Sequence, residues 1–264
     1  FFRDGHVCED CLSKGLSCAV KNKCYRGNRI QTLACVVSTI IHRTLKIYGK
    51  LNYICLTEFN KEKLLHLKQI NEQKVFIKPN AVEVVKQIVP TDEREHRFIY
   101  VGRLEEIKGV EVLFKAWKHL GEDAPELLVC GKGPLEDWCK NYIREHHLNT
   151  VQMLGFVPND EVKKMIGNSK AFILPTQVYE GFPMTIAESY ACGTPVIGSD
   201  LGNTGSLIED GVSGWKFNHT SPETLAECVR KMETWNKKFP EKIQTKYSME
   251  ENYRKLWQIY ENIL

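Results

Sequence analysis

The sequence predicts an α/β fold with a doubly wound parallel sheet, and three observations carry this prediction. From about Arg97 onward, short apolar runs alternate with longer helical stretches, which is the pattern of parallel βαβ units. Glycine and proline gather in the loops that follow those runs. The chain has 264 residues, of which 42% are hydrophobic and 10% aromatic, so it can bury a substantial core.

Six apolar runs are expected to form the strands of this sheet. Each run is short and is followed by a helix or loop candidate. Parallel strands bring their carboxyl ends to one edge, where ligands of such sheets bind, so the loops after these runs form the candidate site. The runs are Phe98–Val101, Glu126–Cys130, Val151–Leu154, Ala171–Leu174, Pro195–Gly198 and Trp215–Phe217.

The region ahead of the sheet, residues 1–80, is too short for a second complete α/β domain. Pro79, Pro90 and the mixed charge over Pro79–Glu95 indicate a linker, placed at residues 81–96, after which the sheet domain is expected over 97–248 and a last helix over 249–264. Apolar spacing predicts further elements, namely helices over Ile30–Tyr48, Phe59–Leu67, Val110–Leu120, Leu225–Trp235 and Met249–Ile263 and strands near Tyr53–Leu56 and Val75–Pro79.

Charge and hydropathy narrow the classes of partner. Lys and Arg number 36 against 33 Asp and Glu, a small excess that disfavours nucleic acid but suits anionic ligands or a lipid surface. The most hydrophobic stretch, Ile30–Tyr48, is interrupted by polar residues such as Gln31, Ser38 and Arg43, which a membrane-spanning helix rarely accepts. A packed amphipathic helix is the simpler interpretation, and contact with one membrane face is the alternative.

The first residues and the cysteines bear on origin and compartment. The chain opens at Phe1 without a methionine, so we expect the true start to lie upstream. Ten cysteines would suit a secreted disulfide scaffold, but six of them are scattered through apolar segments, which fits free cysteines in a cytosolic protein better. These six are Cys35, Cys55, Cys130, Cys139, Cys192 and Cys228.

The strongest local signal is the segment 179–189, which follows the apolar run ending at Leu174. We expect Pro183 to be the first helical residue and Phe182 the N-cap, which has no side-chain oxygen for the first amides of the helix. The N–H groups of Met184 and Thr185 are then open to a phosphate, and Gly181 lets the backbone approach it. The alternative is an ordinary turn.

Two glutamates flank this turn. Glu188 falls in the second turn of the predicted helix beside Ile186 and Tyr190, so we expect it to be partly buried. A buried carboxylate needs hydrogen-bond donors, and the two hydroxyls of a ribose supply them. Glu180 would lie in the loop. The alternative is that both carboxylates are solvated or paired in salt bridges.

Two other strand ends carry glycine and cations. The run ending at Val101 continues with Gly102 and Arg103, and Lys108 follows before the next helix. A guanidinium fork and an ammonium group together could hold a diphosphate without a metal, although unremarkable surface charge explains them equally well. Gly131 and Gly133, ahead of a helix that we expect Pro134 to open, repeat the pattern after Cys130, where a plain turn is the alternative.

All of these pieces, in this order and spacing, resemble the C-terminal domain of the retaining glycosyltransferases of family 4, also called glycosyl transferases group 1. The resemblance covers about Arg97–Ser248, and the Glu-x7-Glu element from Glu180 to Glu188 is its most specific part. It implies the GT-B fold of two facing Rossmann-like domains. The domain at 97–248 would then bind the nucleotide-sugar donor, residues 1–80 would be the end of an incomplete acceptor domain, and the last helix would cross back to that domain.

The resemblance also implies roles for individual residues. Arg103, Lys108 and Glu180 are the catalytic candidates: the two cations would neutralise the donor diphosphate, and Glu180 would contact the hydroxyls of the donor sugar. Glu188 would bind the ribose, and Val157 lies in the loop expected to meet the base. The full donor-binding set is Gly102, Arg103, Lys108, Gly131, Val157, Glu180, Gly181, Phe182, Pro183, Met184, Thr185 and Glu188.

The family transfers a sugar with retention of configuration, so the resemblance implies a hexosyltransferase acting in cell-surface polysaccharide synthesis. The substrate would be a UDP- or GDP-sugar, the acceptor a glycan or a lipid-linked glycan, and no cofactor would be required. The location would be cytoplasmic, with peripheral contact at the inner face of the cell membrane. Two alternatives stay open: a truncated module that binds nucleotide sugar but transfers nothing, and a GT-B-fold epimerase, against which the Glu-x7-Glu element argues.

The cysteines at the start raise a separate hypothesis. Cys8, Cys11, Cys18 and Cys24 form a set that could bind zinc, although the second half lacks the tight pair of common zinc modules, so no metal is assigned. Their neighbourhood also resembles a segment in the middle of the acceptor domain of bacterial family members. That placement implies that roughly a hundred residues of the domain lie upstream. Acceptor contacts therefore cannot be assigned here.

Overall fold

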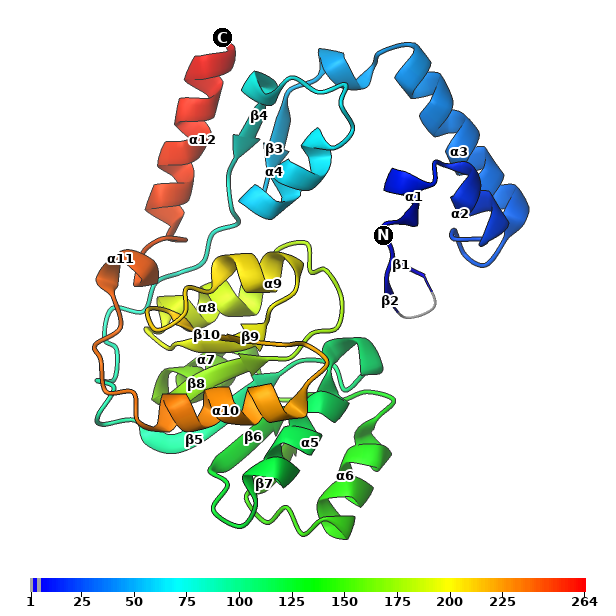
Figure 1. The fold of residues 1–264 in the computed structure, drawn as a ribbon. Coiled ribbons are helices and arrows are strands. Elements are labelled where there is room, and N and C mark those ends of the chain that lie inside the picture. The colour runs from blue at the N-terminus through cyan, green and yellow to red at the C-terminus, as the bar shows by residue number, and fades with distance from the viewer. Residues whose placement is uncertain (1, 4–5) are drawn as a thin grey trace. The chain divides into compact units, whose positions relative to one another are not determined.

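The computed structural model describes residues 2–3 and 6–264, and the chain divides into two compact units. The division falls between Lys78 and Pro79. The first unit has two small two-stranded sheets and the second has one six-stranded sheet, and Figure 1 gives the labels of the elements. Over the described part of the chain, no helix combines the length and the apolar character that crossing a membrane would need.

The second unit is built on one six-stranded sheet in the order β10-β9-β8-β5-β6-β7. All neighbouring strands in it are parallel. This confirms the predicted fold class, and every predicted run lies within a strand or overlaps one. The strands are β5 (Glu95–Val101), β6 (Glu126–Cys130), β7 (Val151–Gly155), β8 (Ser169–Leu174), β9 (Val196–Ser199) and β10 (Gly214–Phe217).

Helices connect these strands and cover the sheet (Figure 1). Helix α5 packs against α10 and α7 against α8, and both faces are covered because the crossovers run outward from the centre in opposite directions. Predicted Val110–Leu120 matches α5 in both bounds. The connecting helices are η3 (Glu106–Lys108), α5 (Val110–Leu120), α6 (Glu136–Glu145), α7 (Asn159–Asn168), α8 (Met184–Ala191), α9 (Gly202–Leu207) and α10 (Pro222–Glu233). Pro134 precedes α6 by two residues and does not open it.

The sheet has one topological switch point. The chain moves from β5 out through β6 to β7, then returns to β8 on the other side of β5. The loops that leave the carboxyl ends of β5 and β8 at this point border the crevice where sheets of this kind bind ligands. Below it the core is dry, because Phe98, Ile99, Phe172 and Ile173 on these two strands are fully buried.

The segment predicted as a linker, residues 81–96, belongs to the second unit by its contacts. Val82 donates its N–H to the carbonyl of Tyr247 at 2.8 Å. The Arg94 guanidinium is buried and donates to Thr194 Oγ1 at 2.9 Å and to the carbonyl of Gly193 at 2.8 Å. Burial lowers the pKa of Arg94 to about 10, which shows how far this cation is desolvated.

The chain ends with α11 (Glu241–Gln244) and α12 (Met249–Ile263), and α12 has the predicted bounds. Its aromatic residues are largely exposed, with Tyr253, Trp257 and Tyr260 all more than half accessible to solvent. That α12 crosses back to an acceptor domain stays a prediction.

The first unit has a small core and one long helix. Cys55, Ile70 and Val75 are the buried residues of its core, beside the parallel pair β3 and β4. Helix α3 begins after Asn28, whose Oδ1 accepts from the amides of Ile30 and Gln31. It ends at Thr44 and not at Tyr48 as predicted, because Lys46 turns into a left-handed conformation. The elements are β1 (Phe2–Arg3), β2 (His6–Val7), α1 (Asp10–Ser13), α2 (Ser17–Lys21), α3 (Arg29–Thr44), η1 (Tyr48–Lys50), β3 (Tyr53–Cys55), α4 (Glu58–Leu65), η2 (Glu72–Lys74) and β4 (Val75–Ile77).

Candidate functional site

An ion pair spans the switch point. Lys108 ends η3, after β5, and Glu180 lies in the loop after β8; the Lys108 Nζ is 2.7 Å from Glu180 Oε1. The hydroxyl of Thr176 donates to the same carboxylate oxygen at 3.1 Å. Both charged side chains are mostly covered, at 28% and 20% exposed. Two predicted site residues from different loops therefore meet in the crevice.

A glycine allows these loops to approach one another. Gly109 has a φ of 71°, and a Cβ at this position would lie 1.7 Å from the carbonyl oxygen of Pro175. No other residue fits without moving the loop that leads to Glu180. The position of Lys108 next to that loop thus depends on Gly109, the residue that follows it in the sequence.

The loop that carries Glu180 is also held from α9. Asn203 is buried near the start of that helix, and its Nδ2 donates to the carbonyls of Glu180 at 2.7 Å and Gly181 at 2.6 Å. These bonds fix two consecutive carbonyl groups of the loop, those of Glu180 and Gly181. The sequence interpretation did not include Asn203, although its place just after the carboxyl end of β9 was a usable signal.

The predicted start of α8 was wrong by one residue. Pro183 is the N-cap and Met184 the first helical residue, because Pro183 has an extended ψ of 93°. Proline offers no side-chain acceptor, so among the described residues no side chain caps α8. The carbonyl of Pro183 accepts from the N–H of Ile186 at 3.0 Å. The N–H groups of Met184 and Thr185 lie in the first turn, where the helix itself offers them no carbonyl acceptor. The basis for an anion site survives with the cap reassigned.

Phe182 and Gly181 differ from what the sequence suggested. Phe182 is buried edge-to-face against Tyr247, with ring centroids 5.5 Å apart, so its side chain anchors the turn. Gly181 is exposed, and a Cβ there would meet nothing within 4 Å. The chain itself leaves room for a side chain at position 181. A ligand that packs against the backbone there would require glycine.

Glu188 lies in the second turn of α8 and is half-buried, as predicted. Burial raises the pKa of its carboxyl, and the nearby Lys163 ammonium opposes that shift. Among the described residues no ion pair involves Glu188, and a carboxylate kept partly from water in this way is ready to accept hydrogen bonds from a ligand.

A hollow of about 360 Å³ joins the ends of β5, β6 and β7. Gly131 has a φ of 148°, and a Cβ there would lie 1.8 Å from the carbonyl oxygen of Gly102, so glycine lets the strand ends close up. Four predicted donor residues line this hollow, together with Lys132 and Phe156, which the sequence interpretation left out of the donor set. The predicted four are Gly102, Arg103, Gly131 and Val157.

Arg103, Lys132 and Phe156 are the exposed members of this hollow. The Arg103 side chain is 72% exposed and pairs with Glu105 across 2.5 Å. Phe156 exposes 75% of its surface, which is unusual for a phenylalanine. A cation and a bare aromatic ring at one hollow suit a ligand with both an anionic and a planar part.

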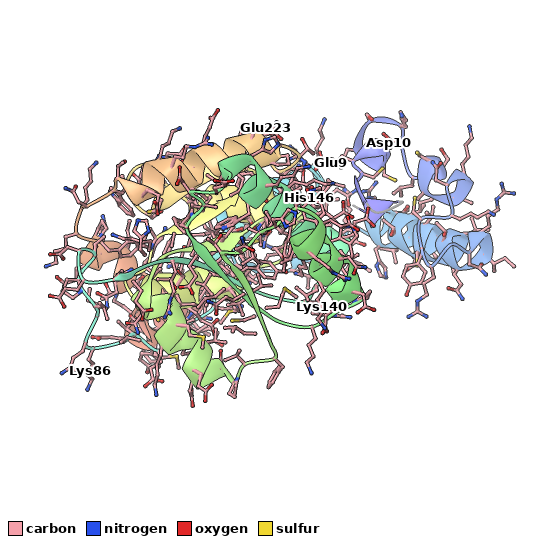
Figure 2. All side chains as sticks on the ribbon, turned by 90° about the horizontal axis from the view of Figure 1, so that it is seen from below. Glu9, Asp10, Lys86, Lys140, His146 and Glu223 are labelled. Carbon is pink, nitrogen blue, oxygen red and sulfur yellow. The ribbon has the colours of Figure 1, made fainter. Side chains whose placement is uncertain are left out.

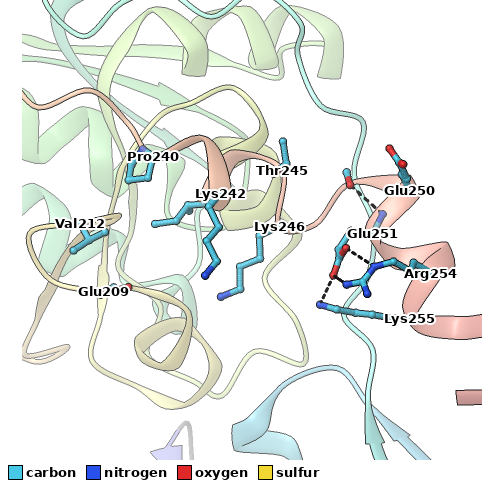
Figure 3. A pocket seen from close by; sticks show the side chains of 12 residues that line it. Glu209, Val212, Pro240, Lys242, Thr245, Lys246, Glu250, Glu251, Arg254 and Lys255 are labelled. Atoms are coloured by element: carbon cyan, nitrogen blue, oxygen red, sulfur yellow. Dashed lines mark hydrogen bonds and ion pairs between the residues drawn. The ribbon is translucent and has the colours of Figure 1, made fainter. Parts of the chain in front are cut away.

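A larger hollow, of about 870 Å³, lies elsewhere. It opens beside α11 and α12, with Lys242 and Lys246 on its wall, as Figure 3 shows. It shares no residue with the predicted donor set. We place the site at the switch point because glycines, cations and a helix N-terminus lie there, whereas the volume of a hollow does not by itself identify a binding site.

The zinc hypothesis gains no support from the arrangement of ligands. All ten cysteines are free, and within residues 2–3 and 6–264 no three His, Cys, Asp or Glu side chains are placed to hold a metal. Burial first, and then the nearby thiols of Cys18, Cys24 and Cys8, raise the pKa of Cys11. Binding of zinc by these four cysteines remains an untested prediction. The side chain of His6 lies outside the described residues.

A doubly wound sheet with glycine-ended strands, cations at its switch point and an uncapped helix is the architecture of α/β domains that bind nucleotides. The family can be stated more closely. Residues 82–248 match the family model described as glycosyl transferases group 1, which covers more than half of the chain, so this chain belongs to that family.

Known proteins agree with this membership. The amylovoran biosynthesis glycosyltransferase AmsK of Erwinia amylovora is 29% identical over 182 residues, covering 63% of this chain and 45% of that protein. The chain therefore spans less than half the length of this curated relative.

Solved glycosyltransferases share the fold. The apo lipopolysaccharide outer core galactosyltransferase WaaB superposes with a TM-score of 0.70 at 23% identity, over 81% of this chain and 62% of that one. S. aureus TarM, solved in complex with fondaparinux, α-GlcNAc-glycerol and UDP, gives a TM-score of 0.66 at 18% identity, over 87% of this chain and 46% of that one. The chain thus has the Rossmann-like architecture of GT-B glycosyltransferases.

Proposed function

We propose that this chain holds a nucleotide-diphosphate sugar, a UDP- or GDP-sugar, at the switch point of its sheet and is the donor side of a retaining hexosyltransferase. The observation that carries the proposal is the ion pair of Lys108 and Glu180 beside the uncapped start of α8. One crevice then offers a cation and two amides to a diphosphate and a carboxylate to a sugar. The UDP held by S. aureus TarM, which shares the fold, supports this ligand class.

Each donor group has a place in this proposal. Lys108, Arg103 and the amides of Met184 and Thr185 take the diphosphate, and Glu188 accepts from the two ribose hydroxyls. The exposed ring of Phe156 stacks on the base at the hollow that Val157 also lines. Glu180 binds hydroxyls of the sugar while Lys108 remains beside it.

The chemical step follows from these placements. The bond between the anomeric carbon and the phosphate oxygen breaks, the electron pair leaves with the nucleoside diphosphate, and the acceptor oxygen bonds to the same face of the sugar. Lys108 and Arg103 stabilise the negative charge that grows on the leaving diphosphate. The leaving phosphate takes the proton of the acceptor hydroxyl. No metal or other cofactor enters the proposal.

We further propose a glycan or lipid-linked glycan as acceptor, in synthesis of a cell-surface polysaccharide at the cytoplasmic face of the membrane. The names of the relatives support this class, because AmsK acts in amylovoran biosynthesis and WaaB on the lipopolysaccharide outer core. A second candidate is a module that binds the nucleotide sugar without transfer, because every site residue named above is assigned to the donor and none to the acceptor.

Calorimetry with UDP, GDP and their sugars tests donor binding. Arg103→Ala and Glu188→Ala should each weaken nucleotide-diphosphate binding at least about tenfold, or about 1.4 kcal/mol, whereas Lys118→Ala, at an exposed position of α5, should not. If neither variant differs from the Lys118 control, the donor site is wrongly assigned. Transfer of radiolabelled sugar to a lipid-linked acceptor separates the enzyme from the binding module.

A further inference from the structure

Gln177 lies in the loop after β8, ahead of Glu180, and contacts the chain on both sides of Lys108. Its main-chain N–H donates to the carbonyl of Ile107 at 2.9 Å. Its side chain lies against Gly109, where an added Cβ would come within 3.0 Å of Gln177 Nε2. The donor site as described so far uses the cation and the acid of the crevice but gives this glutamine no part.

Both donors of the Gln177 side chain are engaged. Its Nε2 donates to the carbonyl of Pro175 at 2.8 Å and to the carbonyl of His219 at 2.7 Å. An amide nitrogen carries two N–H groups, so these two bonds use both of them. The first bond stays within the loop after β8, and the second reaches the loop between β10 and α10. Gln177 therefore joins these two loops to the chain that carries Lys108.

The carbonyl of His219 is a fixed point because Asp200, just after β9, holds this residue. Asp200 Oδ1 accepts from the main-chain N–H of His219 at 3.1 Å and lies 3.1 Å from its ring Nδ1. The main-chain N–H of Asp200 donates in turn to the carbonyl of Phe217, the last residue of β10, at 2.9 Å. The loops after β9 and β10 are thus tied to each other as well as to Gln177.

Helix α10 holds the same loop at its other end. The Ser221 hydroxyl caps the helix by accepting from the N–H of Thr224 at 3.3 Å. Glu223 in the first turn, labelled in Figure 2, lies 3.0 Å from His119 in the last turn of α5. Helix α5 itself begins two residues after Lys108. The loop that Gln177 grips is therefore fixed on both sides.

We propose that Gln177 is a positioning residue of the donor site: it fixes the chain around Lys108, and Asp200 supports it through the main chain of His219. Gln177 acts in this way only if Lys108 binds the donor diphosphate, so the proposal rests on the proposed function. A cation held in place before its ligand arrives needs little reorganisation. The loops after β9 and β10 then influence the donor through the position of one ammonium group.

Hydrogen exchange of the ligand-free chain tests the tether by itself. Gln177→Met keeps the length of the side chain but removes both donors, so residues 105–110 should exchange several times faster. Gln244→Met is the matched control, because Gln244 Nε2 also donates to two main-chain carbonyls, those of Val85 and Ala191. The control should exchange at 105–110 as the parent does. Unchanged exchange there in Gln177→Met overturns the proposal.

A double-mutant cycle tests the role in the donor site, with UDP binding measured by calorimetry on variants that circular dichroism shows to be folded. Gln177→Met should weaken UDP about fivefold or more in the parent, but less than about twofold when Lys108→Met is already present, because linked residues act non-additively. A merely structural glutamine would weaken UDP equally in both backgrounds, and that result overturns the positioning role.

A second pair of variants tests the support from the loop after β10. Asp200→Ala removes the acceptor of both His219 contacts and should weaken UDP about threefold or more, again only while Lys108 is present. His219→Ala removes the ring but keeps the main-chain N–H and carbonyl, so it should weaken UDP far less. Equal losses would show that the ring carries the effect, which overturns the main-chain route to Gln177.

The UDP measurements also distinguish a failure of this proposal from a failure of the proposed function. If Lys108→Met binds UDP as tightly as the parent, the proposed function is wrong and the positioning role falls with it, whatever the exchange shows. If Lys108→Met weakens UDP while Gln177→Met does not, the positioning role alone is wrong.

Discussion

Lys108 Nζ lies 2.7 Å from Glu180 Oε1, and this contact joins the loop after β5 to the loop after β8 across the switch point of the sheet. Thr176 and Asn203 hold the acid from two further directions, through its carboxylate and its backbone. The pair is therefore present before any ligand binds. A cation held in place beforehand costs little reorganisation when a diphosphate arrives.

The first prediction separates the two partners of this pair. Lys108→Met should weaken binding of UDP and GDP at least about tenfold, because a cation is lost from the phosphate side. Glu180→Gln keeps the shape but removes the charge, so affinity for the free nucleotide should change little while the preference among UDP-sugars falls. Calorimetry with nucleotide and nucleotide sugar measures both. If Glu180→Gln weakens free nucleotide as much as Lys108→Met does, the division of roles is wrong.

The second prediction concerns the loop behind Glu180. Asn203→Ala removes two hydrogen bonds to consecutive carbonyls, which should lower the free energy of unfolding by about 1 to 2 kcal/mol. The freed loop should also discriminate less among donor sugars. Urea unfolding gives the stability, and competition between UDP-sugars gives the discrimination. Asn168→Ala, at the end of α7, is the control for loss of an asparagine elsewhere.

The sequence predicted the sheet well because apolar runs identify buried parallel strands without long-range information. Phe98 and Phe172 were each placed in a strand by pattern alone, and both are fully buried. That their two strands are neighbours became clear only from the structure. Lys108 and Glu180 were both named as site residues, but their contact across 72 residues of sequence required the fold. The cap of α8 was misplaced because proline permits both helical and extended ψ, and Pro183 takes the extended value.

The third prediction tests a burial that the sequence did not indicate. Residues 81–96 looked like a linker because Pro90 and the mixed charges around it show no local pattern, yet Arg94 is buried by partners about a hundred residues away. Arg94→Met would leave the Gly193 carbonyl and the Thr194 hydroxyl without this donor. It should cost about 2 kcal/mol of stability. The exposed Arg230→Met should change the unfolding midpoint little, and equal effects would count against the buried role.

The fourth prediction concerns the base. Phe156→Ala should reduce nucleotide affinity about fivefold or more, since stacking on an aromatic ring contributes about 1 to 3 kcal/mol per base. Because the ring is 75% exposed, stability should not fall. Leu154→Ala removes an exposed apolar residue of β7, the strand that ends just before Phe156, and it should leave affinity unchanged because Leu154 does not line the hollow. Inorganic pyrophosphate, which has no base, should bind the parent and Phe156→Ala equally.

The fifth prediction follows from the raised pKa of Glu188. A carboxyl whose folded pKa exceeds its unfolded pKa favours folding while it is protonated; that contribution is complete below the unfolded pKa and is lost as pH rises through the folded pKa. Ionised Glu188 is therefore a cost to the free protein at neutral pH. Glu188→Gln should raise the melting temperature at pH 7, and the difference should vanish near pH 4, close to the ordinary carboxyl pKa of about 4.3.

The same substitution should act in the opposite direction on binding. Only the carboxylate can accept from both ribose hydroxyls, so Glu188→Gln should weaken UDP at pH 7 by about tenfold despite the gain in stability. In the parent, affinity should decline as pH falls toward the raised pKa of Glu188, whereas the variant should show a flatter profile. Ser206→Ala, an exchange of one polar side chain in α9, is a control that should alter neither quantity in this pattern. A variant that is more stable yet binds as tightly as the parent would remove Glu188 from the donor site.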